Sequence, residues 1–150
     1  MSDQAQVWIL DNGQQKVAVA FAELVAVLRH PDIYTLPYSS SWSNQFSHWQ
    51  NNIIPVINLS ERLEKRTEAP LSASQTKKHN MLCILAYPEK NGVAYGGFLT
   101  QHPPYDITIS NDMAHHLPQP VQAWRSISRS CINYQSESIP IVNISAIYAP

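Results

Sequence analysis

Histidine is the residue type in this chain that could most readily do chemistry, because imidazole binds metals and transfers protons near neutral pH. The six histidines are His30, His48, His79, His102, His115 and His116. None belongs to a His-Glu-x-x-His pattern, and no cluster of cysteines or carboxylates accompanies them. The adjacent pair at positions 115 and 116 would point to opposite faces of a strand. We therefore expect no metal site and no cofactor, and we interpret the histidines as loop and surface residues.

Two cysteines and several aspartates are the other candidates for catalysis. Cys83 and Cys131 lie in apolar stretches, with no neighbouring base that would lower the pKa of a thiol. Since no secretory signal is visible, we expect two reduced, buried thiols. Asp32, Asp106 and Asp112 occur in turn contexts, where aspartate is expected to form local hydrogen bonds. Gly-x-Ser-x-Gly and glycine-rich phosphate-binding patterns are also absent, so we expect that the protein is not an enzyme.

The elements that would position any site are organised by a repeat. Residues 49–60 and 134–145, 85 positions apart, each carry an aromatic-Gln pair, an Ile-Pro step, branched aliphatic residues, Asn, another aliphatic residue and Ser. Similarity at a fixed offset is typical of a structural unit used twice, although chance convergence of two β-rich segments is an alternative. We predict one domain over residues 1–150, with a first repeat over about 5–66, a linker over about 67–80 and a second repeat over about 81–148.

Composition points to a protein that associates with other proteins. Charged residues make up only 14% of the chain and apolar residues 44%, whereas an ordinary soluble domain has about 25% charged residues. Ten basic and eleven acidic residues give a net charge of −1, which provides no field to gather nucleic acid. The chain has neither a long apolar run nor a signal-like start. We therefore expect a cytoplasmic protein with no nucleic-acid partner and no membrane insertion.

Short strands separated by turns predict an all-β, barrel-like fold. We expect hairpins over 7–21 and 81–99, and a strand, turn and strand over 21–28. Further strands are expected over 53–59, 107–109 and 139–147, with one or two more over 124–133. One or two helical turns are expected over 63–66. Pro55 cannot donate a ladder hydrogen bond, so we expect it at an edge, at a strand start or at a bulge. Gly96 and Gly97 indicate a bulge or a close approach of the backbone.

Residues 45–59 resemble the signature of the CheW-like domain, in which an Arg-Gly pair precedes an Ile-x-Pro-aliphatic-x-Asp-Leu run. The similarity extends back to Val17 and, more loosely, forward to residues 141–144. It implies two pseudo-symmetric, SH3-like, five-stranded β-barrel lobes around a shared core. It also implies a non-catalytic adaptor of a chemotaxis or twitching-motility complex, with the chemoreceptor cytoplasmic tip and the histidine kinase regulatory domain as partners.

The chain departs from the family pattern at polar positions. Gln50-Asn51 replaces Arg-Gly, Asn58 replaces the Asp, and Ala26 occupies the position of a strand Glu. Loss of the Arg removes a fixed positive fork, so the sequence indicates a divergent or accessory member in which coupling is either abolished or redirected.

Exposed aromatic residues and strand edges provide the candidate contact surface, since Trp and Tyr are frequent interface anchors. The candidate partner-binding residues are Val25, Val27, Trp42, Phe46, Trp49, Gln50 and Asn51. An alternative is a small-ligand-binding β-barrel sensor with a deep pocket between its lobes. A further alternative is an enzyme that uses His48 or His102, which requires perturbed titratable groups gathered in one cleft.

Overall fold

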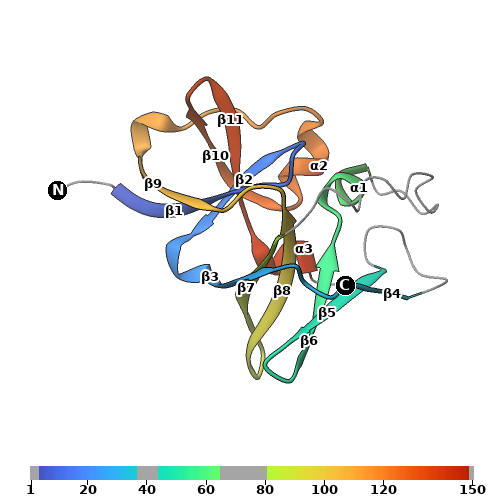
Figure 1. Ribbon diagram of the computed structural model, residues 1–150. Helices are drawn as coiled ribbons and strands as arrows, with labels where there is room; N and C mark the ends of the chain where they lie inside the picture. The colour runs from blue at the N-terminus through green and yellow to red at the C-terminus, as the bar shows by residue number, and fades with distance from the viewer. Residues whose placement is uncertain (1–3, 37–43, 65–80, 149–150) are drawn as a thin grey trace.

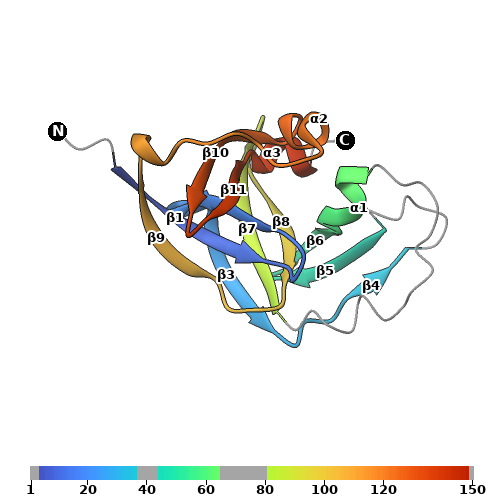
Figure 2. The ribbon, with the colours of Figure 1, turned by 90° about the horizontal axis from the view of Figure 1, so that it is seen from above.

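The computed structural model describes residues 4–36, 44–64 and 81–148, and most of that part of the chain forms two β-sheets (Figure 1). The first sheet has the strand order β10-β11-β2-β1-β9, and the second has the order β3-β7-β8-β6-β5-β4. Figures 1 and 2 both place β9 and β4 at opposite sides of the molecule, with the junction of the two sheets between them. The expected all-β class with two lobes is confirmed.

The strands of the first sheet are β1 (Gln4–Asp11), β2 (Lys16–Ala20), β9 (Tyr105–Ser110), β10 (Ser128–Tyr134) and β11 (Glu137–Val142). Those of the second sheet are β3 (Leu24–Arg29), β4 (Tyr34–Thr35), β5 (Gln45–Trp49), β6 (Asn52–Ile57), β7 (Met81–Glu89) and β8 (Gly92–Thr100). The helical segments are η1 (Phe21–Glu23), α1 (Leu59–Glu64), η3 (Asn111–Met113), α2 (Val121–Arg125) and α3 (Ile144–Tyr148). No described helix has the length and apolar character that a membrane span requires.

The two sheets repeat one topology. In the first sheet β10-β11 is a hairpin whose second strand runs parallel to β2, and in the second sheet β5-β6 is a hairpin whose second strand runs parallel to β8. Antiparallel pairs β1-β2 and β7-β8 follow, with β9 and β3 at the far edges. Each sheet combines strands from both halves of the chain, so the sheets do not coincide with the divisions 5–66 and 81–148.

The repeated sequence motif folds the same way twice. Gln50 and Asn51 have φ angles of 48° and 64°, and Gln135 and Ser136 have φ angles of 52° and 65°. Positive φ at both central residues is the geometry of a type I′ turn, which suits a two-residue hairpin loop. Each hairpin is followed by an Asn that lies at the start of a helix. In the first copy the Arg62 N–H donates to the Asn58 carbonyl (2.9 Å), and in the second the Ile147 N–H donates to the Asn143 carbonyl (3.2 Å). The two copies of the motif therefore adopt the same local structure.

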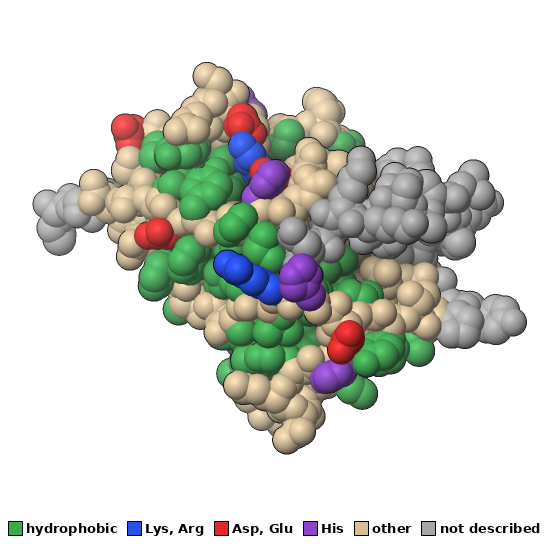
Figure 3. All heavy atoms as spheres, in the orientation of Figure 1, with side chains coloured by type: hydrophobic (Ala, Val, Ile, Leu, Met, Phe, Trp, Pro, Cys, Tyr) green, Lys and Arg blue, Asp and Glu red, His purple; other side chains and the backbone are tan. Residues whose placement is uncertain are grey.

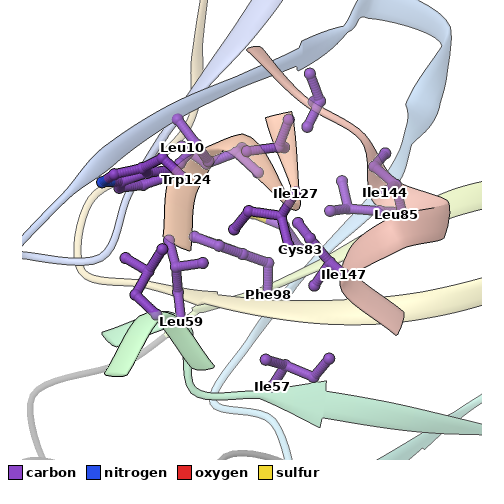
Figure 4. Close-up of a cluster of buried hydrophobic side chains, with 14 residues drawn as sticks. Leu10, Ile57, Leu59, Cys83, Leu85, Phe98, Trp124, Ile127, Ile144 and Ile147 are labelled. Carbon is purple, nitrogen blue, oxygen red and sulfur yellow. The ribbon is translucent and has the colours of Figure 1, made fainter. Parts of the chain in front are cut away.

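Each lobe has its own apolar interior, and a third cluster joins the two lobes. Ile9 and Ile139 belong to the cluster inside the first sheet, and Ile54 and Ile84 to the cluster inside the second. The shared cluster draws residues from both sheets and from all three α-helices, and Figure 4 shows ten of them converging. The labelled residues are Leu10, Ile57, Leu59, Cys83, Leu85, Phe98, Trp124, Ile127, Ile144 and Ile147. The predicted shared core is thus confirmed.

Three expected strands are wrong in part. Trp124 lies in helix α2, and β10 begins only at Ser128. Helix α3 replaces the end of the expected strand over 139–147, because Ile144 and Ile147 lie one helical turn apart and both are buried in the shared core. The segment 21–28 begins as the 3₁₀ turn η1 rather than as a strand. Helix α1 also starts at Leu59, four residues before the predicted helical turns.

Proline and glycine positions show how the second sheet accommodates their backbones. Pro55 lies inside β6, a strand with neighbours on both sides, and the pairing of β6 with β8 begins one residue later at Val56. A Cβ at Gly96 would overlap the ring of Tyr148, whose hydroxyl donates to the Gly97 carbonyl (2.7 Å). The close approach expected at the two glycines is confirmed, and it allows α3 to pack on β8.

Candidate partner-binding surfaces

The tip of the β5-β6 hairpin presents Gln50 and Asn51 to solvent. Both side chains are exposed, and the Asn52 amide donates to the Gln50 carbonyl (3.1 Å) within the turn. A turn that needs two positive φ angles suits Asn and Gly, while Gln adopts this conformation at some cost. The structure therefore keeps the shape of the hairpin while presenting uncharged amides at the positions where the sequence pattern led us to expect Arg-Gly.

An aromatic face covers the outer side of this hairpin. Because side chains alternate along a strand, Phe46, His48 and Ile53 point away from the lobe interior, and Ile53 is 76% exposed. Tyr34 from β4 stacks on Phe46, with ring centroids 5.2 Å apart, and on His48, with centroids 6.0 Å apart. We call Tyr34, Phe46, His48 and Ile53 the aromatic face. These side chains lie together on the outer side of the paired β5-β6 hairpin.

Trp49 occupies the opposite side of the same strand. Its ring meets Tyr95 edge to face at 5.3 Å and packs against the interior cluster that contains Ile54 and Leu82. The half-buried Trp49 is therefore part of the packing that supports the hairpin, and it offers little surface to a partner. Trp42, another predicted contact residue, lies outside the described residues.

A second apolar surface follows the edge of β3. Val25 and Val27 are 43% and 39% exposed, and β3 is the last strand of its sheet. A groove of about 410 Å³ runs along this edge, and we call it the β3 groove. It is lined by Trp8, Leu24, Val25, Ala26, Val27, Arg29, Met81, Pro103 and Pro104. The structure thus separates the predicted residues into the hairpin group and the β3 group.

A larger groove of about 760 Å³ lies between the β1-β2 turn, α1, α2 and β11, and both polar and apolar residues line it. Lys16 donates to Glu137 across it at 2.7 Å, and this hydrogen bond raises the pKa of Lys16. The Ser60 hydroxyl donates to the side-chain oxygens of Gln14 and Gln15. The polar residues of this groove therefore form contacts within the chain, while Leu63, Pro118 and Trp124 supply apolar lining.

The groups that could do chemistry do not form a reactive centre in the described residues. Burial raises the pKa of the Cys83 thiol to about 11 and also raises the pKa of Cys131, so both thiols are held neutral. Both cysteines are buried and free. His48 lies on the aromatic face and His102 is exposed in the loop before β9. The described residues contain no group of three His, Cys, Asp or Glu side chains arranged to hold a metal ion.

Several surface residues were not predicted from the sequence. Tyr34, His48 and Ile53 complete the aromatic face, and Trp8, Pro103 and Pro104 also line the β3 groove. Period-two alternation over 45–49 and 52–57 could have indicated the outward direction of the hairpin residues. No local pattern could have indicated the groove wall, because its residues come from distant parts of the chain.

Few charged side chains interrupt these surfaces. Figure 3 shows one face of the molecule, on which Lys, Arg, Asp and Glu side chains cover only a small part of the coloured area. This agrees with a composition in which only 14% of residues are charged. The surface is suited to burial against another protein, since charged groups would have to be desolvated there.

Comparison with known proteins gives one family and one fold. A family model described as the CheW-like domain matches residues 6–149. The fold is similar to the crystal structure of the scaffolding protein TtCheW from Thermoanaerobacter tengcongensis, with a TM-score of 0.72 and 13% sequence identity over 100% of this chain and 94% of that one. No curated protein matches the chain.

Proposed function

Because the chain belongs to the CheW-like domain family, we propose that it is a non-catalytic adaptor that couples receptors to a histidine kinase in a bacterial chemosensory array. The family match over residues 6–149 is the observation that carries this proposal. An adaptor of this kind acts in the cytoplasm and works by surface complementarity alone. Its partners are the cytoplasmic tip of a chemoreceptor and the regulatory domain of the kinase.

The lobe built on the second sheet is the part that meets these partners. It carries both the aromatic face and the β3 groove, while the thiols that could do chemistry are buried. Stacked aromatic side chains supply large contact area at a small entropy cost, so they act as interface anchors. Ile53 is the most exposed large apolar residue of the described part of the chain and lies beside them.

The uncharged hairpin tip changes how coupling is achieved. With Gln50 and Asn51 in place of the expected Arg-Gly, the tip offers amides that donate and accept hydrogen bonds but attract no carboxylate over a distance. The adaptor therefore recognises its partner mainly through apolar contact. Its affinity should then depend little on salt, because exposed ion pairs are what salt screens most.

The proposal is tested by calorimetric titration of the full chain with a chemoreceptor cytoplasmic tip and with a kinase regulatory domain from the same organism. We expect at least one to bind, and we expect Ile53→Ser to weaken that binding about tenfold, since it removes an exposed apolar anchor. Ser occurs at the matching position 138 of the other hairpin, so Ser138→Ala is the matched control and should bind as the unmodified chain does. Absence of binding to both partners, with the circular dichroism of the folded chain intact, would contradict the proposal.

The small-ligand sensor is not supported by the geometry. That alternative requires a deep, closed pocket, whereas both described grooves are lined in part by exposed residues, including Val25, Val27, Gln119 and Pro120. An enzyme using His48 or His102 would require these residues to share a cleft with perturbed groups. Neither histidine lines either described groove.

A further inference from the structure

We propose that the larger groove, between α1 and α2, binds a proline-rich segment of a partner protein in the polyproline II conformation. This groove of about 760 Å³ lies between the β1-β2 turn, α1, α2 and β11, and we call it the α1-α2 groove. It shares no lining residue with the β3 groove. Figures 1 and 2 both place α1 and α2 away from β3. The site therefore lies beyond the surfaces used in the proposed adaptor function.

Trp124 brings an unused hydrogen-bond donor to this groove. Its ring belongs to the shared core and is only 2% exposed, yet it also lines the groove. In Figure 4 its indole nitrogen lies at the end of the ring that points away from Cys83 and Phe98. The indole N–H of Trp8 donates to the Phe21 carbonyl (3.1 Å), whereas no hydrogen bond among the described residues uses that of Trp124. A nearly buried donor without an acceptor is costly, so a ligand that supplies an acceptor is favoured here.

Gln15 contributes a second donor, because its side-chain oxygen is already used. The Asn12 side-chain oxygen accepts the backbone N–H groups of Gln14 (2.9 Å) and Gln15 (2.7 Å), so the Asn12 amide nitrogen is the atom that acts as donor. That nitrogen donates to the Gln15 side-chain oxygen (3.1 Å), and the Ser60 hydroxyl donates to the same oxygen (3.0 Å). This network fixes the orientation of the Gln15 amide. Its NH₂ group therefore keeps its donors for a ligand in the groove.

The rest of the lining is largely apolar and has no unbalanced charge. The charged residues that the structure describes in the lining, Lys16 and Glu137, form an ion pair at 2.7 Å. An ionic ligand would therefore find no free charge to bind. The occupant should instead be uncharged, with apolar groups and hydrogen-bond acceptors. The apolar lining residues other than Trp124 are Leu63, Pro118, Pro120 and Pro140.

A proline-rich segment has this combination of groups. Each proline presents an apolar ring and a backbone carbonyl that accepts hydrogen bonds, and it has no N–H of its own. The polyproline II helix has no internal hydrogen bonds, so its carbonyls stay available to Trp124 and Gln15. A β-strand would bring amide N–H groups into the groove, where the side-chain oxygens of Gln14 and Gln15 already accept hydrogen bonds within the chain. Because the proline helix is ordered before binding, little conformational entropy is lost.

The test titrates the full chain into a fluorescently labelled short peptide of L-proline and follows fluorescence anisotropy. We expect saturable binding that changes little between low and high salt, because the peptide forms no ion pair. In heteronuclear NMR spectra the indole N–H signal of Trp124 should move downfield at saturation, since its N–H gains an acceptor. The same peptide made of D-proline should not bind, because it has the same composition and the opposite helical hand.

Variants of the chain locate the site. Gln15→Glu keeps the oxygen that Asn12 and Ser60 use and replaces the donor with a second oxygen, so it should weaken binding about tenfold. Gln4→Glu adds the same charge at an exposed residue outside the groove and is the matched control, which should bind normally. Trp124→Phe keeps an aromatic ring without the N–H and should also weaken binding, and its missing signal assigns the Trp124 indole. Circular dichroism confirms that each variant is folded.

Several results would contradict this site. They include equal binding of the D-proline peptide, an unmoved Trp124 indole signal at saturation, and equal loss of binding in Gln4→Glu and Gln15→Glu. Loss of binding in Val27→Lys would place the peptide in the β3 groove, and self-association that competes with the peptide, seen by sedimentation, would assign the groove to a second copy. No binding of the L-proline peptide would overturn the proposal as well. None of these measurements uses a chemoreceptor or kinase, so this site can fail while the adaptor function holds, and the reverse is also possible.

Discussion

The β5-β6 and β10-β11 hairpins have the same backbone geometry, but their outer surfaces differ in chemical character. Their interiors match, since Ile54 and Ile139, which correspond through the repeat, are 0% and 1% exposed. Their outer faces do not match: His48 and Ile53 belong to the aromatic face, whereas the corresponding positions of β10-β11 hold Asn133 and Ser138. Packing constrains the interior of both copies in the same way, while the outer face is free to diverge.

The two edge strands show the same contrast. On β3 the outward residues are Val25 and Val27, and on the corresponding strand β9 the exposed residues include Asp106 and Thr108. The contrast is one of degree, since β9 also carries Tyr105, which is 40% exposed, and Trp8 of the first sheet lines the β3 groove.

The largest expected change in stability tests whether the apolar interiors of the two lobes are packed equally well. Ile54→Ala and Ile139→Ala should each lower the free energy of unfolding by roughly 3 kcal/mol, because both remove fully buried methyl groups and leave a cavity. Urea unfolding followed by circular dichroism measures the change. The exposed Ile53→Ala serves as the control and should change stability by less than about 0.5 kcal/mol. A small effect in one lobe and a large effect in the other would mean that only one interior is well packed.

A second prediction separates the shared core from the lobe interiors by its response to alkali. Cys83 belongs to the shared core, and burial raises its pKa from 9.0 to about 11. The unfolded chain releases this proton near pH 9 while the folded chain keeps it until about pH 11, so stability should fall as pH rises between these values. The loss should be roughly 2 kcal/mol.

Urea unfolding at a series of pH values measures this slope. In Cys83→Ala the slope should be reduced, although the variant is less stable at every pH because of its smaller side chain. Cys131→Ala is the matched control and should keep the Cys83 part of the slope. An equal slope in the Cys83→Ala variant would show that the shared core is open to water at high pH.

The sequence predicted those structural features that depend on a local residue pattern. The β1-β2 and β7-β8 hairpins and the close approach at Gly96 and Gly97 were predicted correctly, because turn residues, apolar alternation and small residues act over a few positions. The short helices were missed at Trp124 and at Ile144–Tyr148. A helix of five residues is too short to show a 3.6-residue period, and tertiary packing rather than propensity holds it in place.

The candidate surface was predicted only in part, for a similar reason. Phe46 was proposed as an aromatic residue beside a loop, and Val25 and Val27 as residues of a strand edge; the structure places them on two separate surfaces. The stacking of Tyr34 on Phe46 requires a strand pairing that no sequence pattern encoded. Trp49 was expected at the surface, but its ring packs inward against Tyr95. Whether the predicted residues bind a partner is what the titrations above decide.

The smallest expected effect distinguishes the two turns. Asn51 and Ser136 occupy matching positions with φ angles of 64° and 65°. Asn tolerates the left-handed region because its side chain bonds locally, whereas Ser is less suited to it. Ser136→Gly should therefore raise the unfolding free energy by about 0.5–1 kcal/mol, and Asn51→Gly should raise it by only a few tenths. Thermal unfolding of both variants measures the difference. An equal gain in both would mean that the turn of the second sheet is as strained as that of the first, and that Asn51 was kept for contact with a partner.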